Sequence, residues 1–178
     1  GPVEMKSCAI IGHRPSRFKW KYNENNSGCK RLKKRLREQF AALYDQGVRR
    51  FYMGGALGTD LWAGEILLQM KACPEYSDIQ LVAALPFEGY DEAWDKKQKE
   101  RMKEICDQSE IVVVCKQPGA VSYKRRNYYM VDQANILLAV YDNDRSLRSG
   151  TGVTVNYARK KGLLIILIHP DTAMVSNE

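Results

Sequence analysis

The sequence predicts an α/β fold, a Rossmann-like three-layer sandwich built on a mainly parallel sheet of about six strands. Short apolar runs of strand length alternate along the chain with amphipathic segments of helical length. Several runs are continuously apolar, among them 111–115 (IVVVC) and 163–168 (LLIILI), as is typical of strands buried on both faces of a parallel sheet. Strict alternation of this kind predicts right-handed crossovers, with helices covering both faces of the sheet.

Each expected element has its own signal. The segment 29–46 carries apolar residues at helical spacing and is followed by Gly47, a common helix stop. The segment 57–72 is apolar and helix-prone up to Pro74, and 90–108 is charged and amphipathic. The expected strands are 7–11, 48–53, 79–85, 111–115, 136–141 and 163–168, and the expected helices are 29–46, 57–72, 90–108, 122–133 and 150–161.

Length and composition predict one domain. The chain has 178 residues, 44% of them hydrophobic, which suffices for a single core, and we expect one domain over 5–178. Residues 1–4 (GPVE) resemble the remnant of a cleaved tag before a native start at Met5. No run approaches the ~18–20 apolar residues of a membrane span, and the N-terminus lacks an apolar signal core. We therefore expect a cytoplasmic protein without a membrane partner.

The five cysteines indicate neither a metal site nor a disulfide framework. Their number is odd, no C-x-x-C pair occurs, and their spacings match no zinc module. Three of them lie in apolar stretches, where cysteine behaves as a small buried hydrophobe. We therefore expect reduced thiols, no metal and no required cofactor.

The positive charge is concentrated in one segment. Residues 14–37 contain ten Lys and Arg against Glu24 alone, whereas the whole chain carries +7, so the remainder is slightly acidic. Phe18, Trp20 and Tyr22 alternate there with cations, a pattern that single-stranded nucleic-acid binding proteins use for base stacking. The alternative interpretation, which we favour, is a lid over a site at the strand ends, followed by the solvated face of a helix.

The loop after the first expected strand carries candidate ligand-binding residues. In open parallel sheets ligands bind beyond the carboxyl ends of the strands, beside helix N-termini. Gly12 allows a sharp exit from the strand, and His13 and Arg14 would place hydrogen-bond donors at the mouth of such a site. The alternative is an ordinary surface turn.

The loop after the second expected strand is rich in small residues and leads directly into a helix. Small residues permit close approach of the backbone to a phosphate, although neither the dinucleotide fingerprint nor a P-loop is present. Asp60, early in the helix, is a candidate for holding ribose hydroxyls or for acid–base catalysis, the alternative being a favourable first-turn charge. The candidates in this loop are Gly54, Gly55, Ala56, Gly58, Thr59 and Asp60.

Two later segments add polar and aromatic candidates. Beyond the fourth expected strand, Arg126 and Asn127 combine a cation with an amide. Because neighbours in sequence do not share a helix face, we expect both at one site only if they lie at the very beginning of the helix. Phe87 and Trp94, after the third expected strand, are candidates for stacking a base, although Trp94 fits a core position equally well.

A second small-residue turn follows the fifth expected strand. Its glycines open the last expected helix and offer another set of backbone amides to an anion. Two such turns at adjacent strand ends can hold one phosphorylated ligand. The candidates here are Asp142, Gly150, Thr151, Gly152 and Thr154.

Taken in this order, the motifs resemble the YpsA-like branch of the SLOG superfamily over 6–170. The superfamily includes the Lonely Guy phosphoribohydrolases and the DNA-binding protein DprA. The resemblance implies a Rossmann-like domain that binds nucleotides or nucleotide-derived ligands, and a homo-oligomer, which we expect to be a homodimer. The motifs that carry it are 12–14 (GHR), 54–58 (GGALG) with 60–63 (DLWA), 126–127 (RN) with 130–132 (MVD), and 150–152 (GTG) with 154–155 (TV).

One departure from the enzymatic relatives bears on catalysis. Lonely Guy enzymes use a P-G-G-x-G-T-x-x-E motif, whose glutamate supports cleavage of the N-glycosidic bond. The matching stretch here is 148–154 (RSGTGVT), which places Thr154 where that carboxylate would stand. The resemblance therefore favours binding over hydrolysis, and the catalytic residues are unknown, with Asp60 as the one candidate.

The sequence thus favours a nucleotide-binding protein that serves as a sensor or sequestering module. Its ligand would resemble ADP-ribose or a cyclic nucleotide signal, with Arg14 and Arg126 neutralising the phosphate charge. Two alternatives stay open. One is a nucleotide N-glycosidase or phosphoribohydrolase that uses Asp60, and the other is single-stranded nucleic acid binding through 14–37.

Overall fold

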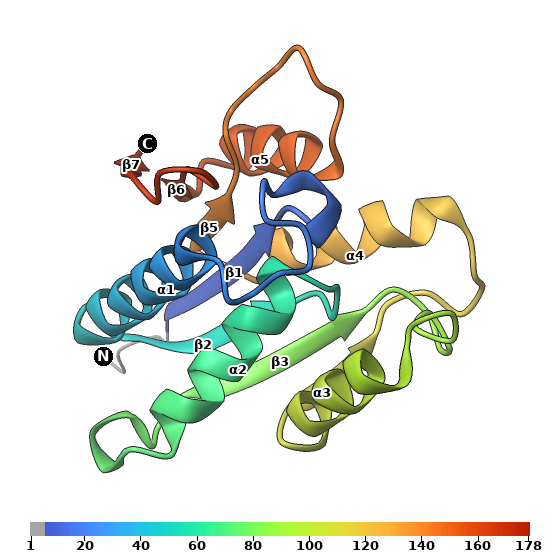
Figure 1. Ribbon diagram of the computed structural model, residues 1–178, viewed down its shortest axis with the longest axis horizontal. Coiled ribbons are helices and arrows are strands. Elements are labelled where there is room, and N and C mark those ends of the chain that lie inside the picture. The colour runs from blue at the N-terminus through green and yellow to red at the C-terminus, as the bar shows by residue number, and fades with distance from the viewer. Residues whose placement is uncertain (1–5) are drawn as a thin grey trace.

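The computed structural model describes residues 6–178, and the tag remnant predicted at 1–4, together with Met5, lies outside the described residues. A seven-stranded sheet forms the middle layer (Figure 1). All neighbouring strands pair in parallel except the last two. The strands are β1 (Lys6–Gly12), β2 (Val48–Met53), β3 (Gln80–Leu85), β4 (Glu110–Val113), β5 (Ile136–Val140), β6 (Leu164–Ile168) and β7 (Val175–Asn177).

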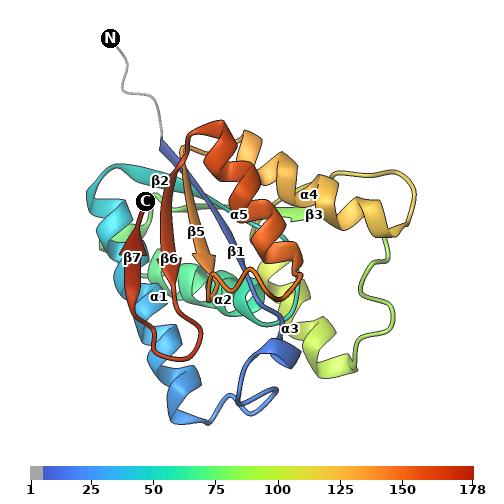
Figure 2. The ribbon, with the colours of Figure 1, turned by 90° about the horizontal axis from the view of Figure 1, so that it is seen from above.

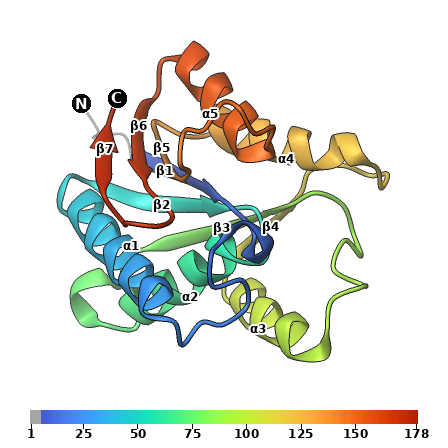
Figure 3. The ribbon, with the colours of Figure 1, turned by 45° about the horizontal axis from the view of Figure 1, so that its top comes forward.

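Helices cover both faces of this sheet, which confirms the predicted three-layer α/β fold. In Figure 3 helices α4 and α5 lie on one side of the sheet and α1, α2 and α3 on the other. β1 supplies both cores, because Cys8 and Ile10 face the first three helices whereas Ala9 and Ile11 face the other two. The helices are α1 (Ser27–Asp45), α2 (Thr59–Lys71), α3 (Lys96–Asp107), α4 (Ala120–Asp132) and α5 (Gly150–Lys161), with short 3-10 turns η1 (Pro15–Arg17) and η2 (Pro74–Tyr76).

Three elements differ from the sequence prediction. The run 111–115 was expected to be a strand buried on both faces, but β4 lies at the edge of the sheet and is largely exposed. The short strand β7 was not predicted, since its three residues are partly or fully exposed and form no apolar run. It pairs antiparallel with β6 at one edge of the sheet, which Figure 2 shows from above. Helix α3 begins six residues later than predicted, because the side chain of Asp95 caps it by accepting the amide of Gln98 at 3.0 Å. Tyr90 and Trp94 therefore belong to the loop that precedes α3.

The strand order places a topological switch point beside β1. The order across the sheet is β4-β3-β2-β1-β5-β6-β7, so the chain runs outward from β1 to β4 and then crosses back to β5 on the other side. The loops that leave β1 and β5 consequently diverge at their carboxyl ends. Open α/β sheets bind their ligands in the crevice between such loops.

The segment between β1 and α1, residues 13–26, is anchored in the body of the protein. Phe18 is completely buried and Trp20 is 8% exposed, and the two rings stack with centroids 4.8 Å apart. Both belong to the core that packs under α1 and α2. These two aromatic side chains are therefore unavailable for stacking bases, contrary to the platform predicted as an alternative. Tyr22, by contrast, is 63% exposed.

An ion-pair network fastens the same segment to three helices. Arg101 of α3 donates two hydrogen bonds to Glu24, at 2.8 and 3.0 Å, and two more to Glu65 of α2. Lys33 of α1 donates to Glu24 at 2.8 Å. Burial alone would raise the pKa of Glu24, but the hydrogen bonds from Arg101 and Lys33 outweigh it and lower the pKa to about 2. The segment is thus a fixed wall rather than a loosely attached lid.

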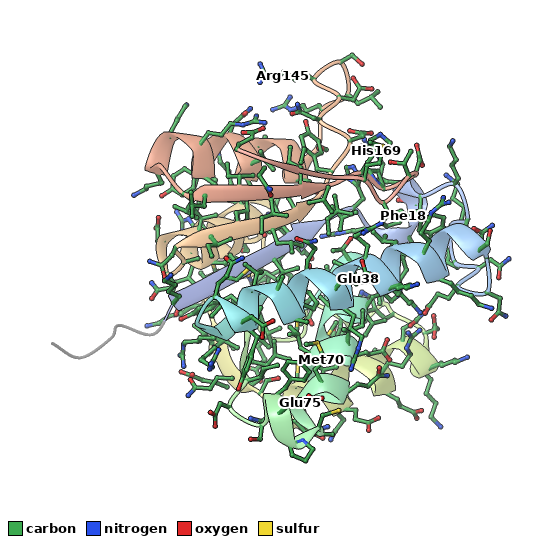
Figure 4. All side chains as sticks on the ribbon, turned by 90° about the vertical axis from the view of Figure 1, so that its left-hand side faces the viewer. Phe18, Glu38, Met70, Glu75, Arg145 and His169 are labelled. Carbon is green, nitrogen blue, oxygen red and sulfur yellow. The ribbon has the colours of Figure 1, made fainter. Side chains whose placement is uncertain are left out.

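The loop between β5 and α5 stands out from the body. Arg145 lies at its outer tip in Figure 4, and Leu147 is an exposed apolar side chain of the same loop. Over 6–178, none of the helices combines the length and the apolar character that crossing a membrane requires.

Candidate functional site

A cavity of about 400 Å³ opens at the switch point, and we call it the central cavity. Its walls come from the loop after β1, the turn before α2, one face of α4 and the beginning of α5. These four elements meet only because β1 and β5 are neighbours in the sheet. A volume of this size is within the range of small-ligand sites, roughly 300–1,000 Å³.

The beginning of α5 presents free amides to the central cavity. Ser149 caps the helix, and its hydroxyl accepts the amide of Gly152 at 3.0 Å. The amides of Gly150 and Thr151 have no partner within residues 6–178, as expected for the first turn of a helix. Both residues line the cavity. Unpaired amides at the positive end of a helix dipole form an anion-binding arrangement.

Four cationic side chains line the same cavity. Arg14 and Lys124 are exposed, as is Arg17, whereas Arg126 is only 4% exposed. The only carboxylate among the lining residues is that of Asp60. The cavity therefore has an excess of positive charge, which favours an anionic ligand.

Arg126 and Asn127 both line the cavity, although they lie in the middle of α4. The expectation that they could share a site only at the beginning of the helix is wrong. The Nε of Arg126 donates to Oδ1 of Asn127 at 2.8 Å, so the two neighbours are drawn together at the cavity wall. Arg126 also donates from Nη1 to the carbonyl of Gly54, in the turn before α2. Burial lowers the pKa of Arg126, and the nearby charge of Asp60 opposes this effect.

Hydrogen bonds to several side chains of the protein occupy the backbone of the turn before α2. The carboxylate of Asp60 accepts the amide of Ala56 at 3.1 Å, and the amide of Gly55 donates to Sδ of Met53 at 3.1 Å. On the outer side, the hydroxyl of Tyr90 donates to the carbonyl of Gly55 at 2.7 Å. Gly54 and Gly55 therefore do not line the central cavity, and only Ala56 and Asp60 of this turn reach it.

Asp60 is buried in this turn. Burial raises its pKa, while the charge of Arg126 and the amide of Ala56 act in the opposite direction. Its carboxylate occupies the position that an external anion would take above the amides of a comparable turn. In this structure Asp60 is thus tied to the backbone that precedes α2.

Three other predicted residues of this region have structural contacts. The hydroxyl of Thr59 donates to the carbonyl of His13 at 3.0 Å, and Thr59 does not line the central cavity. Gly12 packs directly against Thr59, where a Cβ would overlap the threonine side chain. Gly58 has a φ of +81°, and a Cβ there would lie 2.8 Å from the carbonyl oxygen of His13.

His13 contributes a buried imidazole to the cavity wall. Its side chain lines the central cavity, and its Nε2 has no hydrogen-bond partner within residues 6–178. The ring packs edge-on against Tyr141, with centroids 5.8 Å apart. Burial lowers the pKa of His13 below 6.5, the charge of Arg17 lowers it further, and Asp142 and Asp171 act in the opposite direction. Burial therefore favours the neutral imidazole.

The remaining predicted residues divide between the cavity and its surroundings. Thr154 lines the cavity, but its hydroxyl donates to the carbonyl of Gly150 at 2.9 Å, within its own helix. Asp142 lies outside the lining and caps its own loop by accepting the amide of Asp144 at 2.9 Å. Gly152 is required by packing, because a Cβ there would lie 2.7 Å from the hydroxyl oxygen of Tyr141.

A second cavity, of about 330 Å³, adjoins the first, and we call it the aromatic cavity. Tyr22, Tyr90 and Trp94 line it, and Tyr123 is common to both cavities. Trp94 is half-buried, and it packs against the core as well as lining the aromatic cavity. Its position therefore fits both of the roles predicted from the sequence, base stacking and core packing. Phe87 does not line either cavity and instead packs edge-on against Tyr123 at 5.8 Å.

The structure brings ten of the sixteen predicted residues to the central cavity, and their roles in binding stay predictions. The polar and aromatic lining residues that were not among the predicted candidates are Ser16, Arg17, Tyr123, Lys124 and Ser149. Two signals could have found some of them. Tyr123 is three and four residues before Arg126 and Asn127, on the same helix face. The ten are Gly12, His13, Arg14, Ala56, Asp60, Arg126, Asn127, Gly150, Thr151 and Thr154, and the other six are Gly54, Gly55, Gly58, Thr59, Asp142 and Gly152.

The second signal is at Ser149. A serine directly before a glycine-rich helix start is a typical N-cap, and such a cap lies beside the free amides of the first turn.

Solved structures with this architecture include two DNA processing proteins. DprA from Streptococcus pneumoniae superimposes with a TM-score of 0.61 at 17% identity, over 92% of this chain and 50% of that chain. DprA from Helicobacter pylori, described in terms of its single-stranded DNA binding mode, gives a TM-score of 0.58 at 19% identity, over 91% and 64%. The chain thus spans half to two thirds of these proteins, and the likeness shows a shared fold.

Curated relatives are similar over nearly their whole length. The UPF0398 protein of Bacillus thuringiensis (strain Al Hakam) is 28% identical over 161 residues, which covers 89% of this chain and 85% of the relative. The UPF0398 protein of Bacillus cereus (strain AH187) matches to the same extent. The sequence model of the YspA SLOG family, named YpsA, matches residues 8–173. The chain therefore belongs to the YspA SLOG family, as the resemblance of its motifs predicted.

Proposed function

We propose that the protein binds a small phosphorylated nucleotide or nucleotide-derived ligand in the central cavity and acts as a sensor or sequestering module. The observation that carries the proposal is the junction of free helix amides with cationic side chains at the switch point. Gly150 and Thr151, whose amides have no partner within residues 6–178, line the cavity, and Arg14 and three other cationic residues belong to the same lining. A phosphate placed there would accept hydrogen bonds from the backbone and from guanidinium groups together.

The side chains around the cavity favour binding over hydrolysis. Cleavage of an N-glycosidic bond needs a carboxylate or similar group placed to protonate or to stabilise the reacting sugar. Thr154 stands at the position of the Lonely Guy glutamate, and its hydroxyl is engaged with its own helix. The one lining carboxylate, Asp60, is buried and accepts a backbone amide. An N-glycosidase or phosphoribohydrolase would therefore require Asp60 to leave this position.

Single-stranded nucleic acid is the second candidate ligand, and a specific finding favours it. The Helicobacter pylori DprA that shares this fold is described as binding single-stranded DNA. The segment 14–37 supplies exposed cations, among them Lys30, Lys34 and Arg37, outside the central cavity. Contacts of this kind would add to affinity through release of counterions and would be strongly salt-dependent.

A ligand panel with a charge-matched pair of variants tests the proposal. The probes are AMP, ADP-ribose, cyclic mononucleotides and a short oligodeoxynucleotide, and the readout is calorimetric affinity with thermal stability. A ligand at about 100-fold its Kd should add roughly 2.7 kcal/mol of stability. Arg14→Ala, an exposed cavity residue, should weaken binding about tenfold or more, whereas Arg37→Ala, exposed on α1, should not.

The outcomes separate the candidates. A mononucleotide or ADP-ribose that binds and is recovered intact supports the proposal, and released base or ribose phosphate supports hydrolysis instead. Tighter binding of the oligodeoxynucleotide, weakened equally by Arg14→Ala and Arg37→Ala, would favour the nucleic acid. Failure of every probe to bind would overturn the proposal.

A further inference from the structure

The two cavities share one wall, and that wall combines charge with aromatic surface. Arg14, Arg126 and Tyr123 belong to both linings. The guanidinium carbons of Arg14 and Arg126 lie 5.2 and 5.7 Å from the centroid of the Tyr123 ring, each at cation–π distance. Beyond this wall the chemistry changes, because the aromatic cavity is lined mainly by tyrosine, tryptophan and aliphatic side chains.

We propose that the aromatic cavity holds the planar base of a ligand whose phosphate lies in the central cavity, so that the protein selects nucleotides that retain their base over sugar phosphates. This inference rests on the proposed function and specifies its ligand. It assigns the base to Tyr22, Tyr90 and Trp94, which line only the aromatic cavity, and to Tyr123 of the shared wall.

Two rings of the aromatic cavity, those of Tyr90 and Trp94, are held in place by contacts within the protein. Tyr90 and Trp94 pack edge-to-face, with centroids 5.5 Å apart and an interplanar angle of 84°. The hydroxyl of Tyr90 is fixed by its hydrogen bond to the carbonyl of Gly55. A Cβ at Gly55 would lie 2.5 Å from that hydroxyl oxygen, so the glycine permits this approach. Rigid aromatic walls reduce the entropy that binding would otherwise cost.

Tyr22 is the exposed member of the set. It belongs to the segment whose other aromatic residues, Phe18 and Trp20, are buried in the core, yet its own side chain is 63% exposed and lines the aromatic cavity. The network around Glu24 anchors the backbone two residues away. A base that entered the cavity would cover Tyr22, and stacking on an aromatic side chain is favourable for every base.

The test compares probes with and without a base. Affinities are measured for the four ribonucleoside 5′-monophosphates, for ADP-ribose and for ribose 5-phosphate, with wild type and with Tyr22→Ala and Tyr22→Phe. At least one base-containing probe should bind about five- to 100-fold more tightly than ribose 5-phosphate, the range typical of one stacked base. Tyr22→Ala should reduce this preference by about fivefold or more, and Tyr22→Phe, which keeps the ring, should retain it.

A fluorescence measurement locates the base independently. The chain has three tryptophans, and Trp94 is the one that lines the aromatic cavity, whereas Trp20 and Trp62 are buried in the core. The base-containing probe, added at a concentration that saturates each protein, should change the emission of the wild type, and Trp94→Phe should lose most of that change.

Two outcomes would overturn the base assignment alone, and a third would overturn the proposed function as well. If ribose 5-phosphate binds as tightly as every base-containing probe, or if Tyr22→Ala and Tyr22→Phe behave alike, the central cavity binds phosphate and the base assignment is overturned. If none of the probes binds, the proposed function fails and the inference fails with it.

Discussion

Two turns rich in small residues precede helices at the same edge of the sheet, and they are used in opposite ways. The turn before α2 has its amides and carbonyls occupied by Asp60, Met53, Tyr90 and Arg126. The start of α5 leaves the amides of Gly150 and Thr151 without partners in the described chain. The difference comes from the first turn of each helix. The acid in the first turn of α2 accepts a backbone amide of its own turn, so this amide is no longer free for an external anion.

The glycines of the two turns also serve different purposes. Those before α2 make room for other parts of the protein, as at Gly58, where φ is positive and the carbonyl of His13 is close. Gly150 faces open space and has no neighbouring atom within 4 Å of where a Cβ would lie. Similar composition therefore permits close packing against another segment in the turn before α2, whereas it leaves an open surface at the start of α5.

The largest expected effect is on folding at the closed turn. Gly58→Ala should lower the free energy of unfolding by about 3 kcal/mol, because it combines a left-handed backbone with a close contact to His13. Gly150→Ala, the matched change at the open turn, should alter it by less than about 1 kcal/mol. Urea denaturation of both variants checks this, and equal losses would contradict the contrast between the turns.

Asp60→Ala should destabilise the protein by about 1–3 kcal/mol. The substitution leaves the amide of Ala56 without its acceptor and removes the charge that faces Arg126. Asp60→Asn, which keeps an oxygen acceptor, should cost less. Thermal and urea unfolding of the two variants give the comparison, and an alanine variant as stable as the asparagine variant would show that the hydrogen bond contributes nothing.

Gly150→Asp introduces at the open turn the kind of charge that Asp60 brings to the closed one. Since an acid at the first position of a helix is favourable, stability should rise by about 0.3–1 kcal/mol. Affinity for a phosphorylated ligand should nevertheless fall about tenfold or more, because the new carboxylate repels it. The control is Gly150→Asn, which has similar size without charge and should affect affinity much less. Unchanged binding in the aspartate variant would place the anion elsewhere.

The smallest expected effect is a pH dependence from His13, whose carbonyl contacts α2 and whose ring reaches Tyr141 beside α5. Its folded pKa is lowered below 6.5, mainly by burial. Between that value and 6.5 the unfolded chain binds more protons, so stability should rise with pH and level off above about 6.5. The slope cannot exceed about 1.4 kcal/mol per pH unit for one group.

His13→Gln isolates this contribution. Asp60, whose pKa is raised by burial, contributes with the opposite sign, losing stability as pH rises above its ordinary value. The difference between wild type and His13→Gln, measured from pH 5 to 7.5, cancels that background. A difference that does not vary with pH would contradict the buried, neutral imidazole.

Most of the fold could be predicted from the sequence because several strands are continuous apolar runs and such runs alternate with helical patterns along the chain. The strand 48–53 and the helix 150–161 were predicted with the boundaries that the structure shows. The exposed strand β7 and the late start of α3 at the cap Asp95 were missed, since neither depends on an apolar pattern.

The site was harder to predict than the fold. The rule that ligands bind at strand ends predicted the edge of the sheet where the central cavity opens and two of its lining residues, Arg14 and Gly150. Composition could not reveal that Asp60 would occupy the turn before α2, nor that Phe18 and Trp20 would be buried while Tyr22 is exposed. Such outcomes depend on which side chains meet across distant parts of the chain.

The anchoring of residues 13–26 has a kinetic consequence. Because the Glu24 network and the buried rings fix this wall, ligand association should need no slow opening step from it. The expected signature is an observed association rate constant that rises linearly with ligand concentration, without a plateau. Exposed cations at the mouth, Arg14, Arg17 and Lys124, should accelerate the encounter at low ionic strength.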